Sequence, residues 1–240
     1  MKLHALAAGL CVSMAASLWA AAPLRMALPQ RPPIAGSGTG FTPDKGKFRI
    51  LQDGSEVGIE DFELSQSGGA WIARGEAVIR VPGSPETRST GQLHLAADGT
   101  PIRYEWSSQT PKKASGTATF ERGLAKTSIS IEGKDYHEDF QFPSPRVAIL
   151  DNNLYDQYAI LSRLYDWNAK GAQSFPVLIP QDMTPGSITV ESIGSRTVDG
   201  ASFEALRMRT SDLEIDLYFD AGHRLMRLEV PAAKVIVVRQ

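Results

Sequence analysis

Cysteine is nearly absent from this 240-residue chain, and its single example, Cys11, lies in the first apolar segment. The residue before it is Leu10, whereas a lipoprotein signal places a small residue at that position. If this segment is removed, the remaining chain has no cysteine. That excludes disulfides, a thiol nucleophile and a cysteine-ligated zinc, and the folded domain must depend on its hydrophobic core.

Blocks of one charge sign are also absent. The chain has 25 Lys and Arg residues against 27 Asp and Glu residues, a formal net charge of −2. Proteins that bind nucleic acid concentrate basic residues on one face. We therefore expect no nucleic-acid partner.

The apolar run at residues 3–19 is short for a membrane span, which needs about 20 apolar residues. Lys2 precedes this run, and the small residues 20–22 follow it. This pattern is typical of a secretory signal peptide. The sequence predicts a signal peptide at residues 1–22 that is cleaved near Ala22, and a periplasmic or secreted protein with no stable transmembrane span. The alternative is an uncleaved membrane anchor.

Signatures of hydrolases are missing, since neither G-x-S-x-G nor H-E-x-x-H occurs. His137 and Asp139 share a face of a predicted strand, but a metal site needs three or four converging ligands. His94 and His223 are assigned to a strand surface and to a turn. We predict a protein that is not an enzyme and has no cofactor and no metal.

Two pairs of carboxylates are the other candidates for chemistry, because glycoside hydrolysis uses such pairs. They are Glu60 with Asp61, and Glu214 with Asp216. Strand alternation explains both pairs as polar faces of strands. A hydrolase or metal-dependent activity without a recognisable motif is the remaining alternative.

Residues 23–46 contain five prolines and several glycines without periodicity. This composition predicts a flexible leader. The G-S-G-T-G run at residues 36–40 lacks the preceding strand, the following helix and the G-K-[S/T] ending of a phosphate loop, so it is interpreted as linker.

Short segments of alternating hydrophobicity, separated by turn signals such as Asp53-Gly54 and Asp199-Gly200, fill most of the chain from Lys47 onward. Their regular spacing predicts a mainly β, single domain at residues 47–240. Its sheet is an antiparallel meander curled into a half-barrel or flattened barrel. Predicted strands after the first hairpin cover residues 70–81, 92–97, 102–109, 115–121, 127–132, 136–142, 174–179, 187–193, 196–198, 203–209, 213–219, 224–230 and 234–238.

One long helix interrupts this pattern at about residues 151–169, with Asp151 as its N-cap and Gly171 as its stop. We expect the helix to pack on the concave face of the sheet. A narrow apolar stripe on a helical wheel would face the sheet; it comprises Leu154, Tyr158, Leu161 and Tyr165, with Tyr155 and Leu164 beside it.

Ile160 and Trp167 point away from this stripe. Either loops cover these two side chains, or the helix plugs the hollow of a strongly curved sheet and touches walls on both sides. Tyrosine suits a plug, because its ring packs while its hydroxyl reaches a wet rim.

The opening GKFRILQDGSEVGIEDFEL, the mid-chain aromatic helix and the ending LEIDLYFDAGHRLMRLEV resemble uncharacterised exported β-proteins of Gram-negative bacteria. Their architecture looks like the curved, incompletely closed sheets of LolA-like lipoprotein carriers. The resemblance extends from Lys47 to the C-terminus. It implies a concave apolar face that holds acyl chains beneath helices, and it carries over no catalytic residue.

Two function classes follow. The first is an exported envelope protein that binds an apolar or amphipathic, lipid-like ligand in the hollow of the sheet. The second is a non-catalytic envelope scaffold or protein-interaction domain whose core is filled by the helix, with an envelope protein as its partner. The predicted ligand-binding residues are Tyr155, Tyr158, Leu161, Tyr165 and Trp167.

Overall fold

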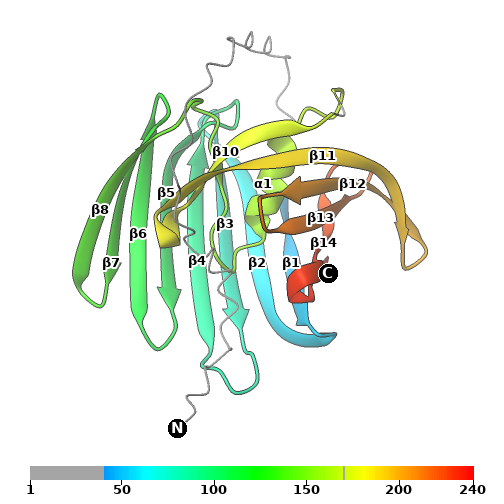
Figure 1. Cartoon of the computed structure of the whole chain (residues 1–240), viewed down its shortest axis with the longest axis horizontal. Coiled ribbons are helices and arrows are strands. Elements are labelled where there is room, and N and C mark those ends of the chain that lie inside the picture. Colours follow the sequence, from blue (N-terminus) through cyan, green and yellow to red (C-terminus); the bar gives the residue numbers. More distant parts are fainter. Residues whose placement is uncertain (1–40, 170) are drawn as a thin grey trace.

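The computed structural model describes residues 41–169 and 171–240, which form one 15-stranded sheet, one α-helix and two short 3-10 turns (Figure 1). The predicted signal peptide and most of the predicted leader lie outside the described residues. The first strand already begins at Asp44, inside the predicted leader. The strands are β1 (Asp44–Gln52), β2 (Ser55–Ser67), β3 (Ala70–Ile79), β4 (Thr87–Leu95), β5 (Pro101–Gln109), β6 (Lys113–Glu121), β7 (Leu124–Ile131), β8 (Lys134–Gln141), β9 (Ala148–Ile149), β10 (Gln173–Ile179), β11 (Thr184–Val198), β12 (Ala201–Arg209), β13 (Glu214–Phe219), β14 (Leu225–Val230) and β15 (Val235–Arg239).

The sheet consists of two meanders joined at its centre. Its order is β8-β7-β6-β5-β4-β3-β2-β1-β15-β14-β13-β12-β11-β10-β9. The join is the antiparallel pairing of β1 with β15, in which Phe48 lies opposite Arg239 and Gln52 opposite Val235. All pairs are antiparallel except β9 with β10. The predicted mainly β meander is confirmed.

Two-residue turns with positive φ close several hairpins, as the sequence predicts. Asp53 and Gly54 have φ values of 49° and 80°, and Asp199 and Gly200 have 51° and 81°. Both residues of such a turn must adopt the left-handed region, which Asp and Gly tolerate. These turns fix the register of the flanking strands.

The prediction of two separate strands at residues 187–193 and 196–198 is wrong. The structure has one long strand, β11, whose register with β12 shifts between Ser192 and Gly194. Such a bulge places an extra residue in one strand and bends it. Gly194 takes a positive φ of 76° there.

The sheet curves around the helix α1 (Asp156–Leu164), which lies inside the hollow (Figure 1). The helix contacts β3 on one side and β9 and β14 on the other. Strands β8 and β9 are the edges of the sheet, which stays open. The two ends of the sheet contact each other without strand pairing. The 3-10 turn η1 (Pro180–Asp182) lies against β6, and Thr127 Oγ1 of β7 donates to Met183 Sδ at 3.6 Å.

Two glycines in one row of the inner face allow the start of α1 to approach the sheet closely. Gly75 of β3 pairs with Gly91 of β4. A Cβ atom on Gly75 would lie 2.8 Å from Asp156 Oδ1, and one on Gly91 would lie 2.7 Å from Leu154 Cδ1. Side chains at these positions would push the helix out of the hollow.

We expect Gly75→Ala to lower the free energy of unfolding by about 1–3 kcal/mol, because the added methyl group overpacks the buried start of the helix. Urea unfolding midpoints measure the effect. Gly171→Ala is the control, since the nearest atom to its Cβ is Ala169 O at 3.7 Å. Its effect should stay within about 0.5 kcal/mol. Equal midpoints for the two variants would contradict the role assigned to Gly75.

Candidate functional site

Helix α1 is buried on all sides. Eight of its nine residues are buried, including Ile160, which the wheel placed on the far side of the helix and which is only 6% exposed. Ile160 lies beside Phe62, Leu64 and Ala73 of the sheet, as the plug requires. Trp167, beyond the end of the helix, is instead covered by His223 of a loop. Among the described residues, no helix combines the length and the apolar character needed to cross a membrane.

The predicted helix bounds of 151–169 are wrong at both ends. The helix begins at Asp156 with Tyr155 as N-cap, and Tyr165 leaves it in an extended conformation with ψ of 130°. Asp151 does not cap the helix, because its carboxylate accepts hydrogen bonds from Tyr104 Oη at 2.9 Å and Gln181 N at 3.0 Å. Gly171 does not stop it either, since the helix has already ended at Leu164.

The sheet caps the helix in place of a local side chain. Glu60 of β2 is fully buried, and its two carboxylate oxygens accept from Tyr155 N at 2.8 Å and Asp156 N at 2.9 Å. A carboxylate at this position satisfies two unpaired N–H groups and interacts favourably with the helix dipole. The interpretation of Glu60 as part of a polar outer face is wrong, since its side chain points into the hollow.

A second polar network fixes the segment that enters the helix. Gln157 Nε2 donates to Tyr104 Oη at 3.0 Å, and Tyr104 Oη donates to Asp151 Oδ2. Gln157 Oε1 accepts from the backbone N–H of Asp151. Tyr104 is 0% exposed. Strand β5, the helix and the preceding loop are thus tied together through buried hydrogen bonds, which are expensive to leave unmade.

Burial in the hollow disfavours the charged form of the carboxyl groups of Glu60, Asp151 and Asp156. Burial raises the pKa of Asp151 to about 7. Burial also raises the pKa of Asp156 to about 6, and burial together with the neighbouring Asp156 raises the pKa of Glu60 well above its usual range. Adjacent buried carboxyls cannot both ionise cheaply, so the pair of Glu60 and Asp156 retains a proton more readily than free carboxyls do.

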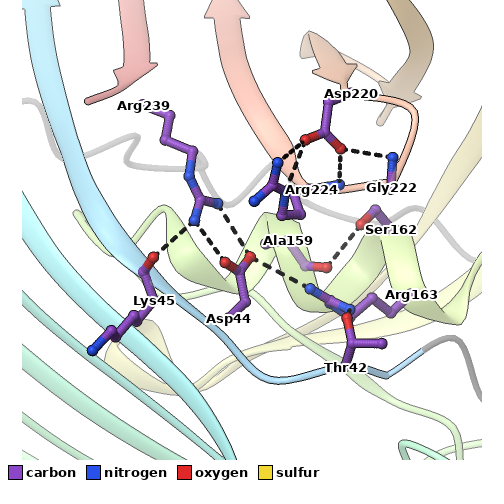
Figure 2. Close-up of polar contacts among 10 residues, drawn as sticks. All are labelled: Thr42, Asp44, Lys45, Ala159, Ser162, Arg163, Asp220, Gly222, Arg224 and Arg239. Atoms are coloured by element: carbon purple, nitrogen blue, oxygen red, sulfur yellow. Dashed lines mark hydrogen bonds and ion pairs between the residues drawn. The ribbon is translucent and has the colours of Figure 1, made fainter.

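The C-terminal turn of α1 is anchored by charge (Figure 2). Asp44 of β1 lies between Arg163 of the helix, whose Nη2 is 3.4 Å from Asp44 Oδ2, and Arg239 of β15, whose Nη2 is 2.6 Å from Asp44 Oδ1. Arg163 Nη1 also donates to Thr42 Oγ1 at 3.1 Å. The ion pairs connect the helix with the central β1–β15 join.

An apolar cavity of about 70 Å³ lies beside the N-terminal end of the helix. Its wall comes from six consecutive strands of the C-terminal meander, and each strand contributes at least one buried apolar side chain. Residues 150–155 and Tyr158 cover it. The buried apolar residues of this wall include Val177, Ile188, Met208, Ile215, Val230 and Val235.

The structure divides the five predicted ligand-binding residues into two groups. Tyr155 and Tyr158 line the cavity. Leu161, Tyr165 and Trp167 do not: Leu161 is 1% exposed in the core, and Tyr165 Oη donates to Gly171 O at 2.9 Å. Trp167 stacks on the ring of His223 with centroids 4.0 Å apart. The five side chains therefore do not form one site.

The other candidate residues lie away from the cavity. His137 and Asp139 are exposed on the edge strand β8, and no cluster of three or more potential metal ligands occurs in the described part of the chain. Asp216 pairs with Arg207 through contacts of 2.7 and 2.8 Å, and Glu214 pairs with Arg209. These last carboxylates are engaged in ion pairs on the sheet.

No protein-family model and no curated protein matches the sequence. Among solved structures, the chain is similar to a β-barrel-like protein of Brucella abortus with a domain of unknown function, DUF1849. The two are 12% identical, with a TM-score of 0.53 over 82% of this chain and 95% of that one. A DUF1089 family protein of Pseudomonas aeruginosa aligns at 10% identity and a TM-score of 0.43 over 72% of this chain and 90% of that one, which is too distant to support an argument.

The first of these similarities shows the fold alone. The chain shares its β-barrel-like sheet with a protein whose function is unknown. The resemblance to LolA-like carriers stays a prediction.

We expect stability to fall as pH rises. The pKa of Asp151 is about 7 in the fold and that of Asp156 about 6, whereas an unfolded carboxyl titrates near 4, so the folded state holds more protons between these values. Unfolding free energy therefore decreases from about pH 4 to about pH 7. Urea unfolding across this range measures the slope.

Asp151→Asn should reduce that slope, because it removes one of the titrating groups. Asp61→Asn, on the exposed outer face of β2, is the control and should leave the slope in place. A slope of wild-type size in Asp151→Asn would show that this carboxyl does not titrate in the range.

Proposed function

We propose that the protein is an exported envelope protein that binds an apolar or amphipathic ligand in the hollow of its curved sheet. The observation that carries the proposal is the apolar cavity between residues 150–158 and the C-terminal meander. Its wall is built from buried Val, Ile and Met side chains, and its cover carries polar groups. An apolar pocket with a few polar groups at its border is the common form of a small-molecule site.

The size of the cavity limits what enters without rearrangement. At about 70 Å³ it is about half of the engineered cavity of about 150 Å³ that accepts benzene. A short aliphatic group fits. A longer acyl chain requires residues 150–155 to move outward, which breaks the hydrogen bonds of Asp151 and the bond from Tyr155 N to Glu60.

The burial of α1 supports a second candidate, the non-catalytic scaffold or interaction domain. A helix with eight buried residues out of nine fills most of the hollow and leaves only the small cavity. On this alternative the exposed surface binds an envelope protein. Recovery of one partner from envelope extracts by the folded domain, with no small molecule bound, would favour it.

Native mass spectrometry of the protein purified gently from its own envelope, followed by organic extraction, tests the ligand. We expect a co-purifying apolar molecule that dissociates on unfolding. A clean apo mass in repeated preparations would contradict the proposal and favour the scaffold.

A matched pair of helix variants separates binding from stability. Tyr158→Ala removes a side chain that lines the cavity and should lower ligand occupancy strongly. Leu161→Ala removes a fully buried side chain away from the cavity, and should cost about 2–5 kcal/mol of unfolding free energy while the surviving folded protein keeps its ligand. If occupancy falls in proportion to stability in both variants, the cavity is not the binding site.

A further inference from the structure

We infer that the cavity accepts an amphiphile whose polar end is neutral or cationic, and that it rejects carboxylates and other anions. This inference rests on the proposed function and specifies its ligand class. It follows from the chemistry of the cavity border.

The border of the cavity is lined by polar residues, whereas its wall is apolar. The half-exposed lining residues include Asn152, Asn153 and Thr210, whereas Val177, Ile188 and Met208 of the wall are buried. An amphiphile that inserts its apolar end into the wall therefore leaves its polar end among amide and hydroxyl groups. These groups hydrogen-bond to a hydroxyl or an amine without requiring a charge.

The charged groups next to this border are acidic. Asp182 accepts from Asn152 Nδ2 at 3.0 Å, and Asp212 accepts from Thr210 Oγ1 at 2.9 Å. Each of these two carboxylates is bonded to a border residue, and together they attract a cation and repel an anion. Asp151 lines the cavity too, but burial raises its pKa to about 7, so it is only partly ionised at neutral pH.

Basic side chains of the neighbouring strands are directed elsewhere. Met208 of β12 lines the cavity, whereas Arg207 and Arg209 on either side of it point to the other face. Arg207 is paired there with Asp216 at 2.7 Å, and Arg209 with Glu214 at 3.0 Å.

Lys234 lies in the sequence between the lining residues Ala233 and Val235. Its side chain is 74% exposed, and its Nζ lies 3.0 Å from Asp53 Oδ1. No Lys or Arg lines the cavity in the described residues. A carboxylate ligand would thus lose part of its hydration without gaining a countercharge, which is unfavourable.

Three probes with the same short chain and different polar ends test the inference: propanol, propylamine and propanoate. Their three-carbon chain suits a cavity of about 70 Å³. At neutral pH they carry no charge, a positive charge and a negative charge. Dissociation constants come from NMR titrations that follow the methyl signals of the cavity wall. We expect propanol and propylamine to bind at least about tenfold more tightly than propanoate, a difference of about 1.4 kcal/mol.

A charge-inserting variant makes the test specific to the border. Ala233→Lys adds a cation to a half-exposed lining position, and should strengthen propanoate binding and weaken propylamine binding. Ala232→Lys adds the same charge to the adjacent exposed residue that does not line the cavity, and should change neither.

The outcomes separate the inference from the proposed function. Propanoate as the tightest probe, or an order unchanged by Ala233→Lys, would overturn the inference and leave cavity binding intact. If none of the three probes shifts the wall signals, the proposed function fails, and the inference fails with it.

Discussion

The first turn of the enclosed helix is buried away from water, and this constraint determines much of the molecule. The first N–H groups of α1 need acceptors that the sheet must supply, and Glu60 supplies them from β2. The strand that carries Glu60 must therefore lie under the start of the helix, and Gly75 and Gly91 provide the space. At the other end, Asp44 holds Arg163 against the first and last strands. Both ends of the helix are thus fixed by residues of the N-terminal meander, while the cavity lies against the C-terminal meander.

The enclosed helix also explains why acidic groups gather in a hydrophobic hollow. Burying a carboxyl is costly, but leaving the N–H groups of the helix unpaired in the same place is costly as well. Glu60 reduces the second cost while raising the first, and Asp151 does the same for the Tyr104 hydroxyl and the Gln181 N–H. The raised pKa values of both carboxyls reflect this compromise. Residues 150–155, which cover the cavity, are accordingly held by hydrogen bonds to carboxyl groups, and the strength of these bonds depends on protonation. The wall of the cavity is held by apolar packing.

The sequence predicts the sheet well because each hairpin is a local event. Asp53-Gly54 and Asp199-Gly200 encode their turns in two residues, and strand alternation separates the inner from the outer face. The candidate site depends on contacts between distant residues, and here sequence reasoning was less successful. Glu60 lies 95 residues before Tyr155, so no local pattern distinguishes this cap from an exposed glutamate. Asp151 looks like a helix cap by its position, but Tyr104, 47 residues earlier, engages its carboxylate instead. The one sequence signal for Glu60 is its position in the strand alternation. It shares a strand face with Phe62 and Leu64, and all three side chains are buried.

The join between β1 and β15 has a consequence for how the chain folds. Apart from the parallel β9–β10 pair, each meander contains only neighbouring hairpins, which form quickly because little chain has to be ordered before contacts are gained. The join instead pairs Phe48 with Arg239, and it brings together the two most distant parts of the described chain. As the polypeptide lengthens, β1 keeps an open edge until a strand of only five residues arrives. The pairing of β15 with β1 therefore converts two separate meanders, each with an exposed inner edge, into a single continuous sheet.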